Sequence, residues 1–159
     1  MNTVYLSLGS NMGNSNKMIT VAINMIEKNI GELKLSSSVY RTAAWGREDQ
    51  PDFVNQIIVV LSILPATEIL KRIFDIEKEM GRVRTVKNAA RVIDIDILFF
   101  NNEVIQTEHL TVPHPHIQNR RFVLEPLAEI SPNFEHPLLK KSSFKLLSIC
   151  SDKLNVQKN

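Results

Sequence analysis

The chain has 159 residues, of which 43% are hydrophobic and 23% charged, a composition typical of a folded soluble protein with one domain over residues 1–159. Its net charge of +2 is too small to favour nucleic acid as a partner, and no apolar run reaches the roughly 18 residues of a membrane-spanning helix. The single cysteine, Cys150, excludes an internal disulfide and a multi-cysteine metal site, and the N-terminus shows no signal-peptide pattern, so we expect a cytoplasmic protein.

The first predicted elements are a strand, a helix and a second strand. Apolar residues alternate over residues 4–8 and predict a short strand, which the turn at 9–14 ends. Residues 16–30 carry apolar side chains at helical spacing. Gly31 is the expected helix stop, because glycine adopts the left-handed cap conformation without strain. Alternation then predicts one strand over residues 33–41.

A long apolar run and an amphipathic helix follow. Residues 53–63 are rich in branched side chains, which predicts a central strand. Pro65 fits the first turn of a helix, apolar residues recur at helical spacing as far as Met80, and Gly81 ends the helix. A further strand is predicted within residues 91–100.

The order of these elements predicts the fold. Strand, helix, strand, strand, helix, strand (βαββαβ) is typical of a ferredoxin-like α+β fold, with both helices on one face of an antiparallel sheet. We expect extra C-terminal strands and helices to cover the other face and complete an α/β/α sandwich. These pieces are a hairpin strand at 103–106, an extended segment at 113–116, helices at 122–130 and 143–149, and a frayed tail at 155–159.

Asp94 and Asp96 lie two residues apart in the apolar run 91–100. Successive side chains on a strand point to opposite faces, so both carboxylates share one face, about 6–7 Å apart. The apolar side chains share the opposite face: Ile93, Ile95, Ile97 and Phe99. Neighbouring carboxylates repel unless a cation lies between them, and magnesium takes such oxygen ligands together with water and phosphate. A solvated polar face is the alternative.

Four basic residues precede this strand: Arg82, Arg84, Lys87 and Arg91. A solvated surface loop is the ordinary interpretation of such a group. Beside paired carboxylates, the same residues indicate a site for a metal-bound polyphosphate.

Three weaker signals lie elsewhere. Asn55 interrupts an apolar strand; its planar donor and acceptor suit the edge of a heterocycle, with a structural asparagine as the alternative. His114 and His116 alternate on an extended segment, so a hydrogen bond from one of them to a phosphate or sugar suits them better than a shared metal ion. Trp45 lies in a polar loop and is either tucked into the core or placed over a flat ligand.

Four ordered blocks of sequence carry a family resemblance. They are Leu-Gly-Ser-Asn (8–11); Tyr-Arg-Thr (40–42) with Asp-Gln-Pro-Asp-Phe-Val-Asn (49–55); Gly-Arg-Val-Arg (81–84) with Arg-Val-Ile-Asp-Ile-Asp-Ile-Leu (91–98); and Thr-Val-Pro-His (111–114) with Asn-Arg-Arg-Phe (119–122). Together they resemble the 6-hydroxymethyl-7,8-dihydropterin pyrophosphokinase family. The resemblance covers nearly the whole chain and implies a ferredoxin-like enzyme of folate biosynthesis. Its reaction passes pyrophosphate from ATP to the pterin hydroxymethyl group and leaves AMP.

The resemblance also implies roles for individual residues. Asp94 and Asp96 would bind two magnesium ions together with ATP, and Arg82 and Arg91 would stabilise charge on the transferring group. The further contacts expected with ATP are Glu77, Arg84, Ile97, Leu110, Thr111, His114 and Arg120. The pterin would lie between the rings of Phe53 and Phe122, beside Asn55, Asp94 and the backbone of Thr42, Ala43, Ala44 and Trp45.

The chain departs from the family pattern in three places. Asn-Ala-Ala (88–90) stands where the family has Trp-Gly-Pro, so the loop tryptophan is missing. Ala43 and Ala44 replace a common Pro-Pro, which leaves the unbound loop less restricted. Phe53 replaces a common tyrosine and keeps the ring. These changes bear on loop closure and turnover more than on the type of reaction.

The residues leave two other functions open. A metal-dependent nucleotidyl transferase or cyclase also places two carboxylates on a strand, but it attacks the α-phosphorus and releases pyrophosphate. A non-catalytic ferredoxin-like ligand-binding or RNA-binding module would want exposed aromatic side chains and a basic stripe, whereas the aromatic content is only 6%. We expect a monomer with ATP and the pterin as partners, without nucleic acid or membrane.

Overall fold

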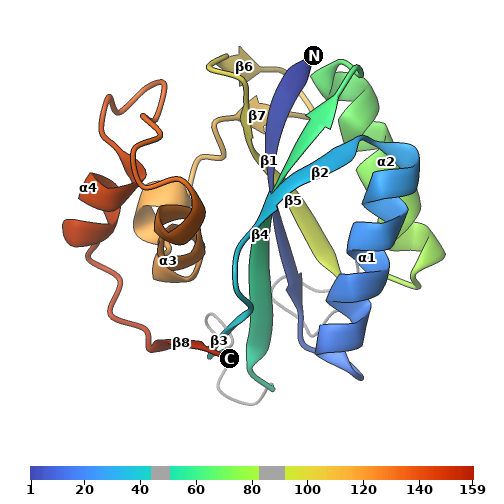
Figure 1. The fold of residues 1–159 in the computed structure, drawn as a ribbon, viewed down its shortest axis with the longest axis horizontal. Coiled ribbons are helices and arrows are strands. Elements are labelled where there is room, and N and C mark those ends of the chain that lie inside the picture. Colours follow the sequence, from blue (N-terminus) through green and yellow to red (C-terminus); the bar gives the residue numbers. More distant parts are fainter. Residues whose placement is uncertain (44–50, 83–91) are drawn as a thin grey trace.

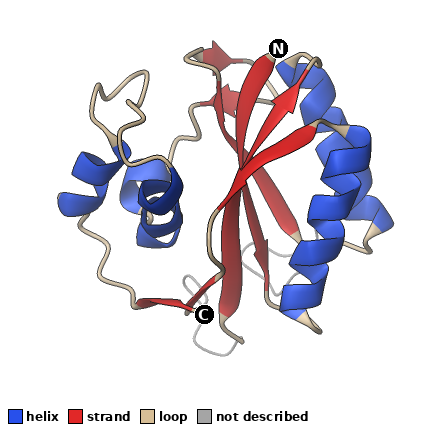
Figure 2. Cartoon of the chain, in the orientation of Figure 1, coloured by secondary structure: helices blue, strands red, loops and turns tan. Residues whose placement is uncertain are grey.

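The computed structural model describes residues 1–43, 51–82 and 92–159, which form three layers (Figure 1, Figure 2). A central sheet carries α1 and α2 on one face and α3 and α4 on the other. The elements are β1 (Asn2–Ser10), α1 (Ser15–Asn29), β2 (Glu32–Ser36), β3 (Tyr40–Thr42), β4 (Phe53–Ser62), α2 (Ala66–Glu79), β5 (Asp94–Phe100), β6 (Ile105–Gln106), β7 (Thr111–Val112), a 3-10 turn (Ile117–Asn119), α3 (Arg121–Ile130), α4 (Ser143–Ser148) and β8 (Val156–Lys158). No helix in the described ranges is long and apolar enough to cross a membrane.

The main sheet has the strand order β5–β1–β4–β3–β8, and its pairings are antiparallel. β2 and β3 share one edge of β4: β2 pairs with residues 58–61 and β3 with residues 53–55. This order places the βαββαβ elements as a ferredoxin-like fold requires, so the predicted fold class is confirmed. β6 and β7 form a separate two-stranded sheet.

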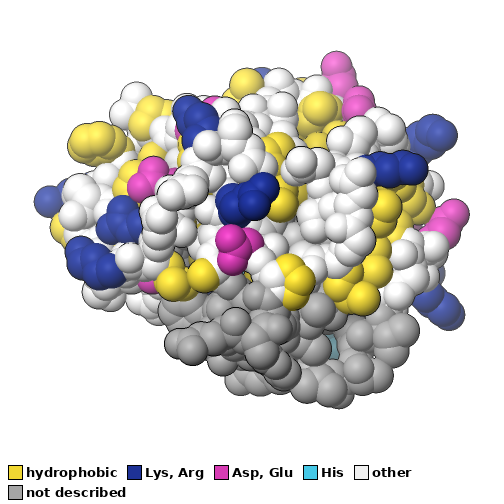
Figure 3. Space-filling view, turned by 90° about the horizontal axis from the view of Figure 1, so that it is seen from below, with side chains coloured by type: hydrophobic (Ala, Val, Ile, Leu, Met, Phe, Trp, Pro, Cys, Tyr) yellow, Lys and Arg dark blue, Asp and Glu magenta, His cyan; other side chains and the backbone are white. Residues whose placement is uncertain are grey.

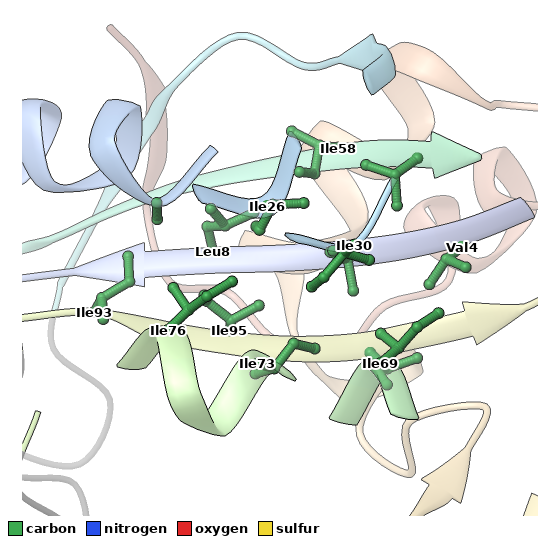
Figure 4. Close-up of a cluster of buried hydrophobic side chains, with 14 of the residues drawn as sticks. Val4, Leu8, Ile26, Ile30, Ile58, Ile69, Ile73, Ile76, Ile93 and Ile95 are labelled. Atoms are coloured by element: carbon green, nitrogen blue, oxygen red, sulfur yellow. The ribbon is translucent and has the colours of Figure 1, made fainter. Parts of the chain in front are cut away.

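One core lies between the sheet and the helices α1 and α2. Figure 4 shows Leu8 of β1 and Ile95 of β5 packed with Ile26 of α1 and with Ile73 and Ile76 of α2. The helix residues recur at spacings of three and four, so they share one face of each helix. Burying each such side chain contributes about 1.5–3 kcal/mol and fixes the β1–β5 pair.

A second core lies between the other sheet face and α3. Tyr5 and Phe99 from the sheet meet Phe134 beyond α3, with ring centroids 4.7 Å apart for Phe99 and Phe134. The Tyr5 hydroxyl is hydrogen-bonded to Ser131 Oγ at 2.8 Å, which satisfies its polar end. The late segments therefore cover the second face, as the sequence predicts.

The predicted face of Phe99 is wrong. Leu6 pairs with Ile97 and Tyr5 with Phe99, so Leu98 is an extra residue on β5. This bulge turns Phe99 toward the α3 side, where it meets Tyr5 edge to face with centroids 5.5 Å apart. The three isoleucines of the same predicted face do lie in the α1–α2 core.

Gly31 has a different role from the predicted helix cap. Its φ is not positive, unlike that of Gly81, whose φ of 92° follows α2 as predicted. A Cβ at Gly31 would lie 2.1 Å from the Leu61 carbonyl oxygen. Glycine is required there because the backbone after α1 passes close against β4.

Three local predictions are also wrong. The single strand expected at 33–41 is divided into β2 and β3, and Ser37 between them exchanges hydrogen bonds with Ile57 of β4. The tail expected to fray contains β8, paired with β3. Residues 115 and 116 form a turn instead of an extended segment.

Candidate active site

A cavity of about 90 Å³, partly open to solvent, lies between the sheet and the start of α3. It is at the end of the sheet where β1 and β3 finish and β4 and β5 begin (Figure 1). Its lining is Ser7, Gly9, Thr42, Ala43, Phe53, Asn55, Asp94, Asp96, Leu98, His114, Arg120, Phe122 and Val123. Nine of these were predicted as site residues from the sequence: Thr42, Ala43, Phe53, Asn55, Asp94, Asp96, His114, Arg120 and Phe122.

Strand register brings these side chains together. Gly9 of β1 pairs with Asn55 of β4 on one side and with Asp94 of β5 on the other. Two residues earlier on β1, Ser7 pairs with Asp96. Directly paired residues point to the same face of a sheet, so both carboxylates and the amide face one cavity.

Asp94 and Asp96 repel each other in this setting. Burial, and then the charge of Asp94, raises the pKa of Asp96 to about 7. Arg82 partly compensates, because its Nη1 lies 2.6 Å from Asp94 Oδ1 and 2.6 Å from Glu77 Oε2. The pair therefore favours additional positive charge beside Asp96.

Glu77 is a buried anchor beneath this cluster. Only 2% of its side chain is exposed, and its carboxylate accepts hydrogen bonds from Arg82 and from the backbone N–H of Ile95 at 2.9 Å. Neither Glu77 nor Arg82 lines the cavity, although Arg82 contacts Asp94, which does. Glu77 thus fixes the guanidinium next to the proposed metal ligands.

The carboxylates of Asp94 and Asp96 would suit a magnesium ion that takes only part of its coordination shell from the protein. Asp94 and Asp96 offer hard oxygen ligands on one face of β5. No cluster of three or more His, Cys, Asp or Glu side chains suited to a metal occurs within residues 1–43, 51–82 and 92–159. Any ion bound by this pair would therefore take its remaining ligands from water and substrate phosphate, which is the usual habit of Mg²⁺.

His114 is a neutral hydrogen-bond donor at the cavity wall. Its backbone N–H donates to the Leu98 carbonyl at 3.0 Å, and its Nδ1 accepts from the backbone N–H of His116 at 3.1 Å. Burial, with the nearby charge of Arg120, lowers the pKa of His114 to about 4. The neutral ring with Nδ1 as acceptor carries its proton on Nε2, which suits an anionic oxygen.

The part of the cavity lined by Phe53 and Phe122 is suited to a flat polar molecule. Phe53 and Phe122 both line it, and the Arg120 guanidinium lies 5.8 Å from the centroid of the Phe122 ring. Thr42 Oγ1 and Asn55 Nδ2 are buried and have no hydrogen-bond partner in the part of the chain that the structure describes. Because unpaired buried donors are destabilising, a ligand with matching acceptors would be held here.

Gly9 makes room for that amide. A Cβ at Gly9 would lie 3.0 Å from Asn55 Oδ1, with the next described atom, Phe53 Cδ1, at 3.8 Å. The absence of a side chain at Gly9 therefore sets how closely Asn55 can sit against β1.

Some predicted residues do not reach the cavity. Ile97 and Leu110 are buried in the α1–α2 core, and Thr111 is exposed on β7. Four others lie outside the described residues: Ala44, Trp45, Arg84 and Arg91. The Asn-Ala-Ala departure at 88–90 also falls outside them.

Sequence reasoning missed four lining residues: Ser7, Gly9, Leu98 and Val123. The signal for two of them was present on β1, where Ser7 and Gly9 alternate with apolar residues and share a face with Tyr5. Val123 gave no such signal, because an apolar residue near a helix start is ordinarily core.

The chain is similar in sequence to known proteins of one family and similar in fold to solved structures. A family model described as 7,8-dihydro-6-hydroxymethylpterin-pyrophosphokinase (HPPK) matches residues 5–132. A 2-amino-4-hydroxy-6-hydroxymethyldihydropteridine pyrophosphokinase of Aquifex aeolicus is 44% identical over 141 residues, covering 89% of this chain and 88% of that protein. The Bacillus subtilis protein of the same description is 40% identical, covering 84% of this chain and 81% of its own length.

Among solved structures, an HPPK-DHPS of Plasmodium falciparum superimposes with a TM-score of 0.77 over 92% of this chain. The chain spans 43% of that protein, and their sequences are 18% identical. This likeness supports the fold alone. The sequence comparisons carry the likeness in function.

Proposed function

This chain belongs to the 7,8-dihydro-6-hydroxymethylpterin-pyrophosphokinase family, and from that premise we propose which of its residues carry the family's reaction. The protein is an enzyme of folate biosynthesis that transfers a pyrophosphoryl group from ATP to hydroxymethyldihydropterin. The hydroxymethyl oxygen bonds to the β-phosphorus, and the bond from the β-phosphorus to the α–β bridging oxygen breaks, so the products are AMP and the pterin diphosphate.

We assign the pterin to the part of the cavity between Phe53 and Phe122. The observation that carries this assignment is the pair of buried, unpartnered groups Thr42 Oγ1 and Asn55 Nδ2 on the cavity wall. A pterin ring presents acceptors and donors along its edge and flat apolar faces, so it would pair with these groups and stack on the two rings. Asp94 borders the same space, where the hydroxymethyl group would meet the phosphates.

We assign the triphosphate to the Asp94–Asp96 end. The two carboxylates would hold magnesium ions together with ATP, as the fit of the donor set supports. Bound magnesium supplies charge neutralisation on the phosphates and a lower pKa for the attacking hydroxyl. Phosphoryl transfer depends mainly on such positioning and charge stabilisation, which this end of the cavity is built to give.

Three side chains of this chain would orient the phosphates. The Arg82 guanidinium donates hydrogen bonds to Asp94 and Glu77. From this position it could exchange a carboxylate oxygen for a phosphate oxygen of ATP as its acceptor. The positive charge of Arg120 acts on Asp96 and partly offsets the rise of the Asp96 pKa. His114 would donate from Nε2 without adding charge of its own.

The contacts with the adenosine part of ATP, and the roles of residues outside the described ranges, stay predictions. We propose that Glu77, Ile97, Leu110 and Thr111 lie near ATP, and that Arg84, Arg91, Ala44 and Trp45 complete the site. We further propose that residues 1–159 form one pterin pyrophosphokinase domain, acting as a cytoplasmic monomer. In the face of the molecule shown in Figure 3, basic and acidic side chains are interspersed over the described part. This mixture supports an enzyme that acts on small molecules over a nucleic-acid-binding protein.

The first test is product analysis. We expect AMP from ATP only when magnesium and hydroxymethyldihydropterin are both present, and none after chelation with EDTA. Release of pyrophosphate instead of AMP would indicate attack on the α-phosphorus and refute the assignment.

The pocket itself is tested by Asn55→Ala. We expect the KM for the pterin to rise about 10-fold, since a buried hydrogen bond contributes about 0.5–1.5 kcal/mol and each 1.4 kcal/mol is tenfold, while the KM for ATP stays unchanged. Gln56→Ala is the matched control, because Gln56 follows on β4, points away from the cavity and bonds to the Ser37 carbonyl. Equal pterin KM values in Asn55→Ala and the wild type would remove Asn55 from the site.

A further inference from the structure

One wall of the proposed pterin pocket rests on a very short strand. β3 has three residues, Tyr40–Thr42, and it carries Thr42 to the cavity with Ala43 directly after it. On one side β3 pairs with β4, so that Thr42 lies opposite Phe53 and Tyr40 opposite Asn55. Short strands are marginal by themselves, so the position of this wall depends on what else holds β3.

Strand β8 holds the other edge of β3. Val156 pairs with Thr42 and Lys158 with Tyr40, and the Asn159 N–H donates to the Val39 carbonyl at 2.8 Å. β8 therefore lies beside the same residues that face the pocket, although it lines none of it.

A hydrogen-bond network centred on the exposed Glu129 fastens β3 to α3 as well. The Tyr40 hydroxyl donates to Glu129 Oε1 at 2.6 Å, and the Ser38 hydroxyl donates to Glu129 Oε2 at 2.9 Å. Lys158 Nζ lies 5.9 Å from the Tyr40 ring centroid, so β8 packs against this network. Partial desolvation alone would raise the pKa of Glu129, but these hydrogen bonds and the charge of Lys158 lower it, which keeps Glu129 an acceptor.

We propose that β8 is a positioning element of the pterin pocket: by pairing with β3, it keeps Thr42 in register with Phe53 and Asn55. This inference rests on the proposed pterin site. It concerns residues beyond the 5–132 segment that the family model matches. Residues 156–158 thus act on pterin binding through β3, without touching the ligand.

The sharpest test is a proline in β8. In an antiparallel ladder, alternate residue pairs exchange hydrogen bonds, so the Asn159–Val39 bond makes Gln157 and Arg41 the next bonded pair. Gln157→Pro removes the N–H of that pair, whereas Gln157→Ala removes only an exposed side chain and is the matched control.

We expect Gln157→Pro to weaken pterin binding about threefold to tenfold, the change that corresponds to one net hydrogen bond. Calorimetry with 6-hydroxymethyl-7,8-dihydropterin gives the pterin Kd, and α,β-methylene-ATP gives the nucleotide Kd. The nucleotide Kd should not change, and Gln157→Ala should match the wild type in both. Equal weakening for both ligands, or for neither, would overturn the proposal.

Two further measurements separate positioning from general stability. Hydrogen exchange at the Arg41 amide, which faces β8, should accelerate in Gln157→Pro while amides of β1 keep their protection; loss of protection throughout the sheet would contradict a local role. Tyr40→Phe keeps the ring but removes the bond to Glu129, so it should also raise the pterin Kd selectively.

The outcomes also distinguish this inference from the site on which it rests. If Asn55→Ala leaves the pterin Kd unchanged, the pocket assignment itself fails. If Asn55→Ala weakens pterin binding but Gln157→Pro does not, the pocket assignment stands and the role of β8 is refuted.

Discussion

The close contact between Gly9 and Asn55 predicts that one added methyl group will weaken pterin binding. In Gly9→Ala the new Cβ would start 3.0 Å from Asn55 Oδ1, whereas its other described neighbours lie at 3.8 Å or more. An unstrained carbon–oxygen contact needs about 3.4 Å, so the amide must retreat by about 0.4 Å. That retreat would lengthen a hydrogen bond of about 2.9 Å to about 3.3 Å, beyond the usual range.

The magnitude follows from the hydrogen bonds at risk. Losing most of one of them corresponds to about 0.5–1.5 kcal/mol, so the KM for the pterin should rise roughly 3-fold to 10-fold, no more than in Asn55→Ala. The KM for ATP should stay constant, because the strain falls on the Asn55 amide. Steady-state assays of AMP formation at saturating ATP measure the first value, and assays at saturating pterin measure the second.

A double-mutant cycle supplies the control. If Gly9→Ala acts by moving the Asn55 amide, it should have no further effect on pterin KM once Asn55→Ala has removed that amide. The coupling energy should then nearly equal the effect of Gly9→Ala alone. Additive effects in the double variant would refute the reasoning, since they would show that the methyl group acts elsewhere.

Three more predictions address metal binding, pH dependence and packing. Asp94→Ala and Asp96→Ala should each cut kcat/KM by about 10²–10⁴ and abolish the calorimetric magnesium signal with ATP; turnover like wild type at saturating magnesium would exclude them as ligands. The pKa of His114 falls from 6.5 to about 4 on folding, so the unfolded chain binds more protons between these values and stability rises with pH there. Relative to the wild type, His114→Gln should therefore gain a few degrees in Tm as pH drops from 7.5 to 4.5, and a constant difference would contradict this. Gly31→Ala should lower Tm by about 6–12 °C, because the new Cβ would meet the Leu61 carbonyl oxygen at 2.1 Å. Gly13→Ala is the control: its Cβ would lie in open space, so only the φ of 65° opposes it, at a cost of about 1–2 kcal/mol of stability.

The sequence located the carboxylates and the amide because each breaks a strong local pattern. Asp94, Asp96 and Asn55 are polar residues inside apolar strands, and the structure places all three on the cavity wall. The element order was equally informative, since it depends on long periodic segments and not on exact boundaries.

What the sequence could not give depends on tertiary contacts. Gly31 looks like a helix cap, but its need for glycine comes from Leu61, thirty residues further on. β8 contains little apolar surface, and its pairing is supplied by the backbone of β3. Phe99 changes face because of a bulge, which adds one residue to β5 without any mark in the local alternation.

The position of the cavity follows from three strands that change from apolar to polar or small residues within two neighbouring rows of the sheet. On the face toward α3, β1 passes from Tyr5 to Ser7 and Gly9, and the paired strands change from buried apolar residues to Asn55 on β4 and to Asp96 on β5. Because the strands are in fixed antiparallel register, these changes fall in neighbouring rows, and α3 packs on the apolar rows while its first turn borders the cavity. A slip of β4 by two residues relative to β1 would keep every side chain on its face, yet it would move the Asn55 amide out of the row that it shares with Asp94. The register, more than any single motif, therefore makes one site from residues that lie far apart in the sequence.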